Sequence, residues 1–441
     1  MSRILNKITL GAAAFGLLAS VSTAALAAPP ADWSQVPTKN VKLFYPGQSS
    51  YQWLRSSEHK RADKKTWRGD SCVSCHEDEE RELGQLMVSG KRLEPHPITG
   101  KQDVVDLAVQ AAHDKDNLYF RFQWKTKNPY PGTAHPHWQF DGKDWKAMGW
   151  PRLHKKVWGE GQPAIYEDRL SMMIDDGSVP MFKEQGCWLT CHDGMRDMQG
   201  LAKTADVKAQ ALLGKVLKKK DVRKYLPSSR TDKNATWDKT KSPEEIAKIK
   251  AAGGFVDLMQ WRGHRSNPIG MTDDGYVLQY RLFDAGKKMF SKNWDKKAKM
   301  PKYMFDVKKV GFKSRTMDQI RDTSKPSSLI VEDNAAKFDP KAGWKKGDMI
   351  PEYYLTRAVK GSAGDNQDAK GTWKDGVWTV VWTRKLDTGH PEDDKIMKPG
   401  GVYTFGFAVH DDNITTRGHH VSWPMSVGIG TKADIKAVTM K

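Results

Sequence analysis

Large apolar residues alternate with polar residues between positions 118 and 125. A period of two predicts a β-strand with one buried face. The stretch 103–112 also has the composition of a strand, and the polar residues 114–117 between the two are a turn signal. The two stretches are therefore predicted to form a hairpin.

Similar alternation recurs through the second half of the chain. Asp375 and Gly376 form a tight-hairpin signal just before one of these later stretches. Regular short strands joined by polar loops are typical of a β-sandwich, so the chain is predicted to be mainly β. The later alternating stretches are 276–282, 378–382, 403–409 and 421–429.

Three other stretches lack this period. Residues 201–252 are rich in Lys and Ala and are predicted to be helical with a break at Pro227, and Ser242 followed by proline is a favourable helix start. Residues 283–370 hold many Lys, Asp and Gly and are predicted to form long loops, while 31–70 are polar and irregular. The sandwich is thus expected to carry helical and long-loop insertions.

The first 27 residues have the layout of a secretory signal peptide. A short positive segment precedes an apolar run from Ile8 to Leu26, which ends on a small-x-small cleavage site at residues 25–27. A membrane anchor is the alternative, but Gly11 and Ser20 interrupt the run and no stop-transfer pattern follows. Because no other stretch approaches the roughly 20 apolar residues that span a bilayer, the mature chain is expected in the periplasm without a transmembrane segment.

Composition narrows the class of partner. The chain has 441 residues, 17 tryptophans and a formal net charge of +19. A strongly basic balance favours either solubility alone or a basic face that steers an acidic partner protein. Nucleic acid is not an expected partner, because the chain is predicted to be exported and has no recognisable nucleic-acid motif.

The four cysteines form two pairs, and a histidine directly follows each pair. Cys72, Cys75 and His76 form a C-x-x-C-H motif, the signature of covalent haem attachment. In such a motif two thiols bond the haem vinyl groups and the histidine binds the iron as proximal ligand. The first motif therefore predicts a haem c.

The second pair has one residue more between its cysteines. Cys187, Cys191 and His192 form a C-x-x-x-C-H variant, which we also expect to hold a haem c. Two disulfides are an alternative in an exported protein, and a zinc site could use Cys and His at similar spacing. Neither explains the histidine that follows both pairs, although a disulfide stays the main alternative at the second pair.

Several stretches together resemble the ethylbenzene dehydrogenase-like haem-binding domain, which also serves as the haem subunit of molybdenum enzymes related to dimethyl sulfoxide reductase. The resemblance covers about residues 100–430 and implies a β-sandwich with haem at one end of the sheets. We accordingly divide the chain into a small N-terminal haem c segment, 28–100, and a haem-binding sandwich, 101–435, with its helical insertion at about 201–252. The matching stretches are 166–170, 256–262, 265–270, 378–386 and 401–411.

The resemblance also suggests ligands for the second haem. Family members with non-covalent haem b use Met and Lys as axial ligands, whereas this chain has the Cys187 pair with His192 where the methionine is expected. The family's lysine lies near the last strand, and this chain has His419 and His420 there. Because His419 shares strand parity with Val421, it is the expected distal ligand, with His420 next and a surface-loop role for both as the alternative.

The distal ligand of the first haem is left open between two candidates. His96 lies between two prolines, which stiffen the backbone around it, and Met87 is the second candidate. A His/Met pair has a higher potential than a bis-His pair, so the choice affects function. His135 and His137 are reserve candidates, and the remaining histidines, such as His59, His154 and His390, are expected to be solvated.

These features predict an electron carrier rather than an enzyme. A haem with both axial positions filled cannot readily bind a substrate, and two haems in one chain form a short relay. The expected redox partners are a membrane quinol dehydrogenase or another cytochrome on one side and a redox enzyme, by family analogy a molybdoenzyme, on the other. The alternatives are a haem enzyme that reduces peroxide or nitrite at an open axial position and a structural haem subunit.

Overall fold

The computed structural model describes residues 28–90, 94, 100–126, 132–364, 368–415 and 418–440. The predicted signal peptide, residues 1–27, lies outside the described residues. Among the helices of the described ranges, none is both long and apolar enough to cross a bilayer.

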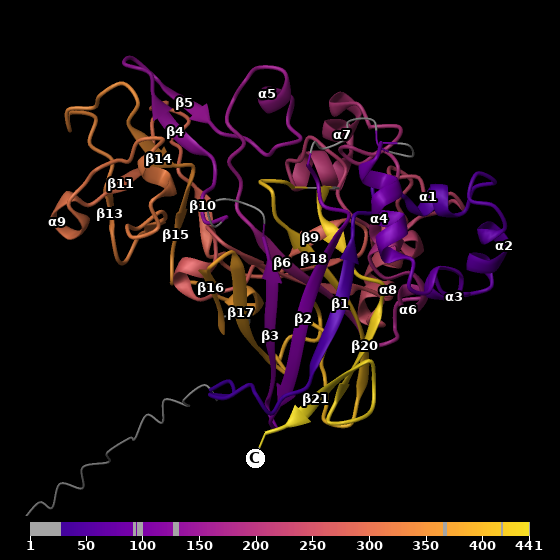
Figure 1. The fold of residues 1–441 in the computed structure, drawn as a ribbon. Helices are drawn as coiled ribbons and strands as arrows, with labels where there is room; N and C mark the ends of the chain where they lie inside the picture. The colour runs from indigo at the N-terminus through magenta and orange to yellow at the C-terminus, as the bar shows by residue number, and fades with distance from the viewer. Residues whose placement is uncertain are drawn as a thin grey trace, which may run out of the picture.

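Thirteen strands form one main sheet in the described chain (Figure 1). The neighbour order is β16-β17-β3-β2-β1-β19-β18-β6-β7-β8-β9, and β20 and β21 link β18 back to β2. Strands β2, β1, β19, β18, β20 and β21 therefore close a ring of six. The strands are β1 (Thr38–Phe44), β2 (Val104–His113), β3 (Asn117–Lys125), β6 (Arg169–Asp175), β7 (Val256–Arg262), β8 (Gly275–Val277), β9 (Arg281–Phe283), β16 (Asp368–Lys374), β17 (Val377–Lys385), β18 (Val402–His410), β19 (His420–Val421), β20 (Met425–Ile429) and β21 (Ile435–Thr439).

The main core lies between two limbs of this sheet, by which we mean the part that contains β3 and the part that contains β18. The alternating apolar residues of β3 are almost fully buried, as predicted. Phe120 packs against Phe405 at a ring-centroid distance of 5.7 Å, and Phe122 packs against Phe407 at 5.8 Å, which joins β3 to β18. The mainly β class is confirmed. A sandwich has two separate sheets, whereas here β19 on one side and β20 with β21 on the other connect the two limbs.

A second apolar cluster covers the other face of β18, β6 and β7. Met173, Leu258 and Ala408 point to this face and meet short helices from the N-terminal segment and the insertion, which gather on one side of the sheet (Figure 1). The helices are α1 (Tyr51–Leu54), α2 (Ala62–Trp67), α3 (Val73–His76), α4 (Glu80–Val88), α6 (Phe182–Gln185), η1 (Gly186–Thr190), α7 (Thr204–Ala209), η2 (Ala211–Val216), η3 (Pro227–Ser229) and α8 (Pro243–Ala251).

The prediction of long loops over 283–370 is wrong for much of that range. Several strands of two or three residues pair there and with β4 and β5, in three small sheets: β14-β4-β5, β10-β15-β12 and β11-β13. Such strands are too short to show a period of two. The elements are β4 (His137–Phe140), β5 (Trp145–Met148), α5 (Lys155–Trp158), η4 (Asn267–Ile269), β10 (Phe290–Lys292), β11 (Tyr303–Phe305), α9 (Val307–Val310), η5 (Gln319–Arg321), β12 (Leu329–Ile330), β13 (Ala335–Lys337), β14 (Met349–Pro351), β15 (Tyr353–Leu355) and η6 (Ser362–Gly364).

Local sequence signals predicted where elements begin more reliably than alternation predicted how long the strands are. The predicted helix start is confirmed, because Ser242 and Glu245 form a capping box at α8. The single strand predicted over 276–282 is instead the hairpin β8–β9. The strand predicted over 421–429 is two strands, β19 and β20, with Pro424 between them, since proline cannot donate to a ladder.

Candidate haem-attachment sites

Cys72, Cys75 and His76 lie on a single helical turn. Cys72 caps α3, and its carbonyl oxygen accepts from the backbone N–H groups of Cys75 (3.2 Å) and His76 (3.1 Å). Cys72 is half-buried and Cys75 is exposed, and both are free thiols. Two thiols and one imidazole on a single short turn are the donor set that a covalently attached haem requires.

The His76 ring is oriented by contacts on two sides. Its Nδ1 lies 2.7 Å from a carboxylate oxygen of Glu79, a contact of the kind that fixes the ring of a metal-binding histidine. The ring is nearly parallel to that of His59, at 6.0 Å, and to that of Trp423, at 6.2 Å. His76 therefore lies between another imidazole and a tryptophan.

His59 was expected to be solvated, but the structure places it beside the first motif. Its Nδ1 lies 3.2 Å from the carbonyl oxygen of Leu54, and its ring stacks on Trp53 at 4.8 Å. The rings of His59 and His76 are stacked with centroids 6.0 Å apart, so His59 is near enough to the first motif to be a candidate ligand once its ring turns edge-on. The signal available in the sequence was the presence of both histidines in one short segment.

The second motif packs directly on the main sheet. Cys187 lies in η1 and is buried, and the N–H of Cys191 donates to the carbonyl oxygen of Trp188 (3.1 Å). A Cβ at Gly406 of β18 would lie only 2.9 Å from the Cys187 sulfur, so only glycine allows this close approach. The extra residue of the motif is accommodated in this 3₁₀ turn.

His192 is fully buried at the end of that turn. Its Nδ1 lies 3.0 Å from the side-chain amide nitrogen of Gln52, and its ring stacks on Tyr225 at 3.8 Å. Burial, followed by the nearby charge of Arg230, holds the pKa of His192 well below its usual range. The imidazole is therefore neutral, as a metal ligand must be. Its Nε2 lies close to the carbonyl oxygens of Leu189 (3.2 Å) and Tyr225 (3.0 Å), contacts that an iron ligand at Nε2 would have to exchange.

The two motifs lie against each other. The backbone N–H of Cys72 donates to the carbonyl oxygen of Glu184, just before the second motif (3.1 Å). Trp423 contacts His76 on one side and Trp188 of the second motif on the other, where the ring centroids are 4.9 Å apart. The fold thus brings together two motifs that are more than a hundred residues apart in the sequence.

The two histidines expected near the last strand point in different directions. The ring of His419 stacks on His410 at 4.6 Å. His420 is fully buried, with Nδ1 3.4 Å from the Lys101 ammonium and Nε2 2.9 Å from the carbonyl oxygen of Gln102. His420 is therefore engaged at both ring nitrogens.

The remaining ligand candidates fall in other groups. Met87 of α4 is buried with Tyr45 and Ile414 in a small apolar cluster. His96 lies outside the described residues. The reserve candidates His135 and His137 pack against His264, at 5.6 and 6.4 Å, in a group of rings that includes neither motif histidine.

The thiols lack the properties of reactive cysteines. Burial raises the pKa of Cys72 and of Cys187 to about 11, and burial also raises the pKa of Cys191. Reactive thiols have lowered pKa values, so thiol–disulfide exchange is a poor fit. Within the described ranges, the side-chain groups close enough to share a metal ion consist of aspartates, so the cysteines and histidines do not converge on a zinc site.

The stretches that carry the family resemblance form a buried ion network. Glu167, two residues before β6, pairs with Arg265 (2.7 Å) and also approaches Arg169 (3.3 Å) and Arg262 (3.7 Å). Next to it, Asp168 accepts from the Trp378 indole N–H of β17 (2.9 Å). These residues join β6, β7 and β17, so their role in this chain is structural.

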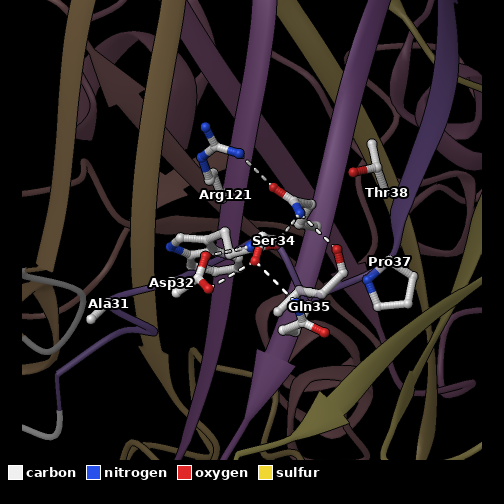
Figure 2. Close-up of a pocket in the computed structure, with 10 residues that line it drawn as sticks. Ala31, Asp32, Ser34, Gln35, Pro37, Thr38 and Arg121 are labelled. Atoms are coloured by element: carbon white, nitrogen blue, oxygen red, sulfur yellow. Dashed lines mark hydrogen bonds between the residues drawn. The ribbon is translucent and has the colours of Figure 1, made fainter.

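A polar hollow of about 780 Å³ lies away from both motifs, against the outer face of β2 and β3 (Figure 2). Residues 31–38 line it together with Gln110 and Arg121. Gln110 donates to the carbonyl oxygens of Trp33 and Val36 (2.8 and 2.7 Å) and accepts from Arg121 (2.7 Å). These contacts tie the N-terminal segment to the sheet, and the hollow includes none of the motif residues.

Comparison with known proteins gives two kinds of match. The model of the family described as ethylbenzene dehydrogenase matches residues 31–422, a range that includes both cysteine motifs. A protein named cytochrome c-552, from Stutzerimonas stutzeri, is 30% identical over 436 residues, which cover 98% of this chain and 99% of that protein. A protein named cytochrome c-551, from Rhodocyclus tenuis, is 28% identical over 173 residues, which cover 38% of this chain and 58% of that protein.

Proposed function

This chain belongs to the family described as ethylbenzene dehydrogenase, and from that premise we propose that it is an exported c-type cytochrome with two covalently attached haems that relays electrons between redox proteins. The observation that carries the proposal is the contact between the two cysteine–histidine motifs through Trp423. Two redox centres this close together form a relay within one chain.

The residues of the first motif fit a haem c with two histidine ligands. Cys72 and Cys75 would form the thioethers and His76 would be the proximal ligand, held by Glu79. We propose His59 as the distal ligand in preference to His96 and Met87, because its ring lies 6.0 Å from that of His76 and could turn edge-on toward a shared iron. When bound, the haem supplies one-electron oxidation and reduction at its iron.

The residues of the second motif fit a haem held against the sheet. Cys187 and Cys191 would form the thioethers, and the neutral imidazole of His192 would be the proximal ligand. We keep His419 as the proposed distal ligand and His420 as the second candidate, since the family's second axial ligand lies near the last strand. Gly406 gives the Cys187 thiol its close approach to β18.

The proposed partners follow from charge and from the family. A net charge of +19 suits an acidic partner protein at the electron-entry or electron-exit step. The signal-peptide pattern supports a periplasmic location, and a quinol dehydrogenase and a molybdoenzyme are the partners suggested by analogy. Electron-transfer rates with an acidic partner should then fall as salt concentration rises.

The proposal is tested by counting haems on the mature chain. After expression in a host with c-type maturation, mass spectrometry should show two haem additions, and the pyridine haemochrome spectrum should show two haems c per chain. A single addition with a Cys187–Cys191 disulfide would refute the second site. Rapid binding of cyanide or nitrite at a high-spin haem would instead support the alternative, a haem enzyme that reduces a small oxidant.

A further inference from the structure

Five aspartates converge in the interior at one end of the β7–β8–β9 edge. Carboxylate oxygens lie within 4.8 Å of one another in two overlapping triads, one of Asp257, Asp274 and Asp394 and one of Asp284, Asp393 and Asp394. Each of the five residues is at most 4% exposed. They come from β7, from the residues on either side of the β8–β9 hairpin, and from the loop after β17.

Two cationic side chains lie near the group, and they make different contacts. Arg384 donates to Asp257 (2.7 Å) and is itself fully buried. The Lys395 ammonium is directed to Asp176 (2.6 Å) and Asp175 (3.5 Å), outside the group. Arg384 therefore neutralises Asp257, whereas Asp284 has no hydrogen-bonded cation among the described residues.

Asp284 gives independent evidence that a ligand belongs here. It is 4% exposed, and neither of its carboxylate oxygens has a hydrogen-bond partner among the described residues. Neither carboxylate oxygen of Asp394 has a hydrogen-bond partner among the described residues. The side chain of Thr388 is nevertheless near enough to lower the pKa of Asp394. A buried, ionised and unpaired carboxylate is very costly, so it must be neutralised by a proton or by a cation.

We propose that this aspartate cluster binds a divalent cation, Ca²⁺, at the base of the β8–β9 hairpin. Donors that are all carboxylate oxygens select a hard cation and disfavour zinc and copper. Two oxygens that each lie 2.3–2.6 Å from one Ca²⁺ can be up to about 5 Å apart, so the oxygens of either triad, all within 4.8 Å of one another, are close enough to share one ion. Ca²⁺ accepts six to eight oxygens in flexible geometry, which suits carboxylates from separate segments around Asp394 better than the octahedral, water-retaining Mg²⁺.

Without a cation, burial and like charges favour the protonated form of these carboxyl groups. Burial, followed by the charges of Asp274 and Asp394, raises the pKa of Asp284 to about 12. Burial, followed by the charge of Asp257, raises the pKa of Asp394 to about 7. A bound Ca²⁺ would reverse both effects and keep the carboxylates ionised.

The ion would connect the hairpin to the second cysteine motif. Asp274 and Asp284 flank the hairpin, and the chain between them packs against the insertion: Leu278 accepts from the backbone N–H of Leu226 (2.8 Å). Tyr280 lies 6.2 Å from Tyr225, whose ring stacks on His192. The cation would therefore hold the hairpin in the position where it supports the His192 pocket.

The first test is metal analysis of the full-length purified protein after dialysis against metal-free buffer. Elemental analysis should show one calcium per chain in the wild type and in the control Glu392→Gln, an exposed neighbour of the cluster. The double variant Asp284→Asn, Asp394→Asn should hold none. No stoichiometric metal in the wild type, or a stoichiometric metal other than calcium, would overturn the proposal.

The second test separates a cation site from protonated carboxyl groups. The wild type is unfolded in urea with EDTA, refolded with Ca²⁺, Mg²⁺ or neither, and its melting temperature is measured. Ca²⁺ should raise the melting temperature by several degrees and Mg²⁺ by less. Equal melting temperatures in all three buffers, or an Asp284→Asn variant more stable than the wild type in Ca²⁺, would show that protons neutralise the cluster. If the variants do not fold, the wild-type measurements still decide.

Discussion

The imidazole rings of His59 and His76 face each other at 6.0 Å with planes only 12° from parallel. Each ring is also held through its Nδ1, which lies 3.2 Å from the carbonyl oxygen of Leu54 in His59 and 2.7 Å from the carboxylate of Glu79 in His76. In metal sites, a hydrogen-bond partner at Nδ1 of a histidine leaves its Nε2 to bind the metal. The two rings are therefore held parallel and close together, and because an imidazole binds iron through a lone pair in its ring plane, they would have to turn edge-on to share one iron.

Replacing His59 should change the first haem alone. His59→Ala should shift that haem toward high spin, because it loses its sixth ligand. His59→Met should keep it low-spin and raise its potential, because a His/Met pair has a higher potential than bis-His. Visible and EPR spectra with a redox titration measure both effects, and His390→Ala is the control. Unchanged spectra in both His59 variants would return the role to His96 or Met87.

Trp423 should contribute strongly to stability, because it packs between the two motifs. It is 8% exposed, and truncating a buried Trp to Ala usually costs about 3–5 kcal/mol of the free energy of unfolding. Trp423→Ala should lose at least about 3 kcal/mol in urea unfolding, and Trp423→Phe should lose less. Trp158, which is 64% exposed, gives the control Trp158→Ala, whose effect should stay within about 0.5 kcal/mol. Equal losses in the two Ala variants would contradict this packing role.

The sequence predicted the long strands and both motifs, since these depend on local pattern. The alternation in β3 and the Asp375–Gly376 turn between β16 and β17 are local signals, and the structure confirms them. Strand β1 was missed, although it lies in the ring between β2 and β19. Only its last residues alternate, and its burial depends on partners that are distant in the sequence.

The site was predicted less completely than the fold. The proposed thioether cysteines and proximal histidines rest on spacing in the sequence, whereas the proposal of His59 needed its three-dimensional proximity to His76. Strand parity predicted that His419 points inward, but His420 is the fully buried one of the two and meets Lys101 and Gln102. The aspartate cluster draws on four segments, so no local pattern indicated it.

Replacing His419 should affect the second haem and leave the first unchanged. His419→Ala should shift the second haem toward high spin and change its potential. His420→Ala should instead lower stability, because it removes buried contacts with Lys101 and Gln102. Spectra and urea unfolding of the two single variants and the double variant distinguish these effects. If none of the three changes a spectrum, Met181, Met195 and His264 become the residues to test.

Glu167 should make the protein sensitive to acid. Burial alone would raise the pKa of its carboxyl group, but Arg265, Arg169 and Arg262 outweigh burial and lower the pKa to about 2, from an ordinary 4.5. A carboxyl group whose pKa is lower in the folded state stabilises the protein above its unfolded pKa, and this stabilisation is lost as pH falls toward 2. A difference of about 2.5 pH units corresponds to about 3 kcal/mol.

Glu167→Gln should therefore lose about 3–5 kcal/mol of the free energy of unfolding at pH 7, because three buried guanidinium groups lose their charged partner. The loss should shrink as pH falls from 5 to 2, since the wild type gives up the same interaction by protonation. Urea unfolding at several pH values measures this, with the exposed Glu392→Gln as control. The stability curves of the two proteins should converge between pH 5 and 2, because only the wild type has a carboxyl group at position 167 to protonate. If the two curves stay parallel, other carboxyl groups cause the acid transition.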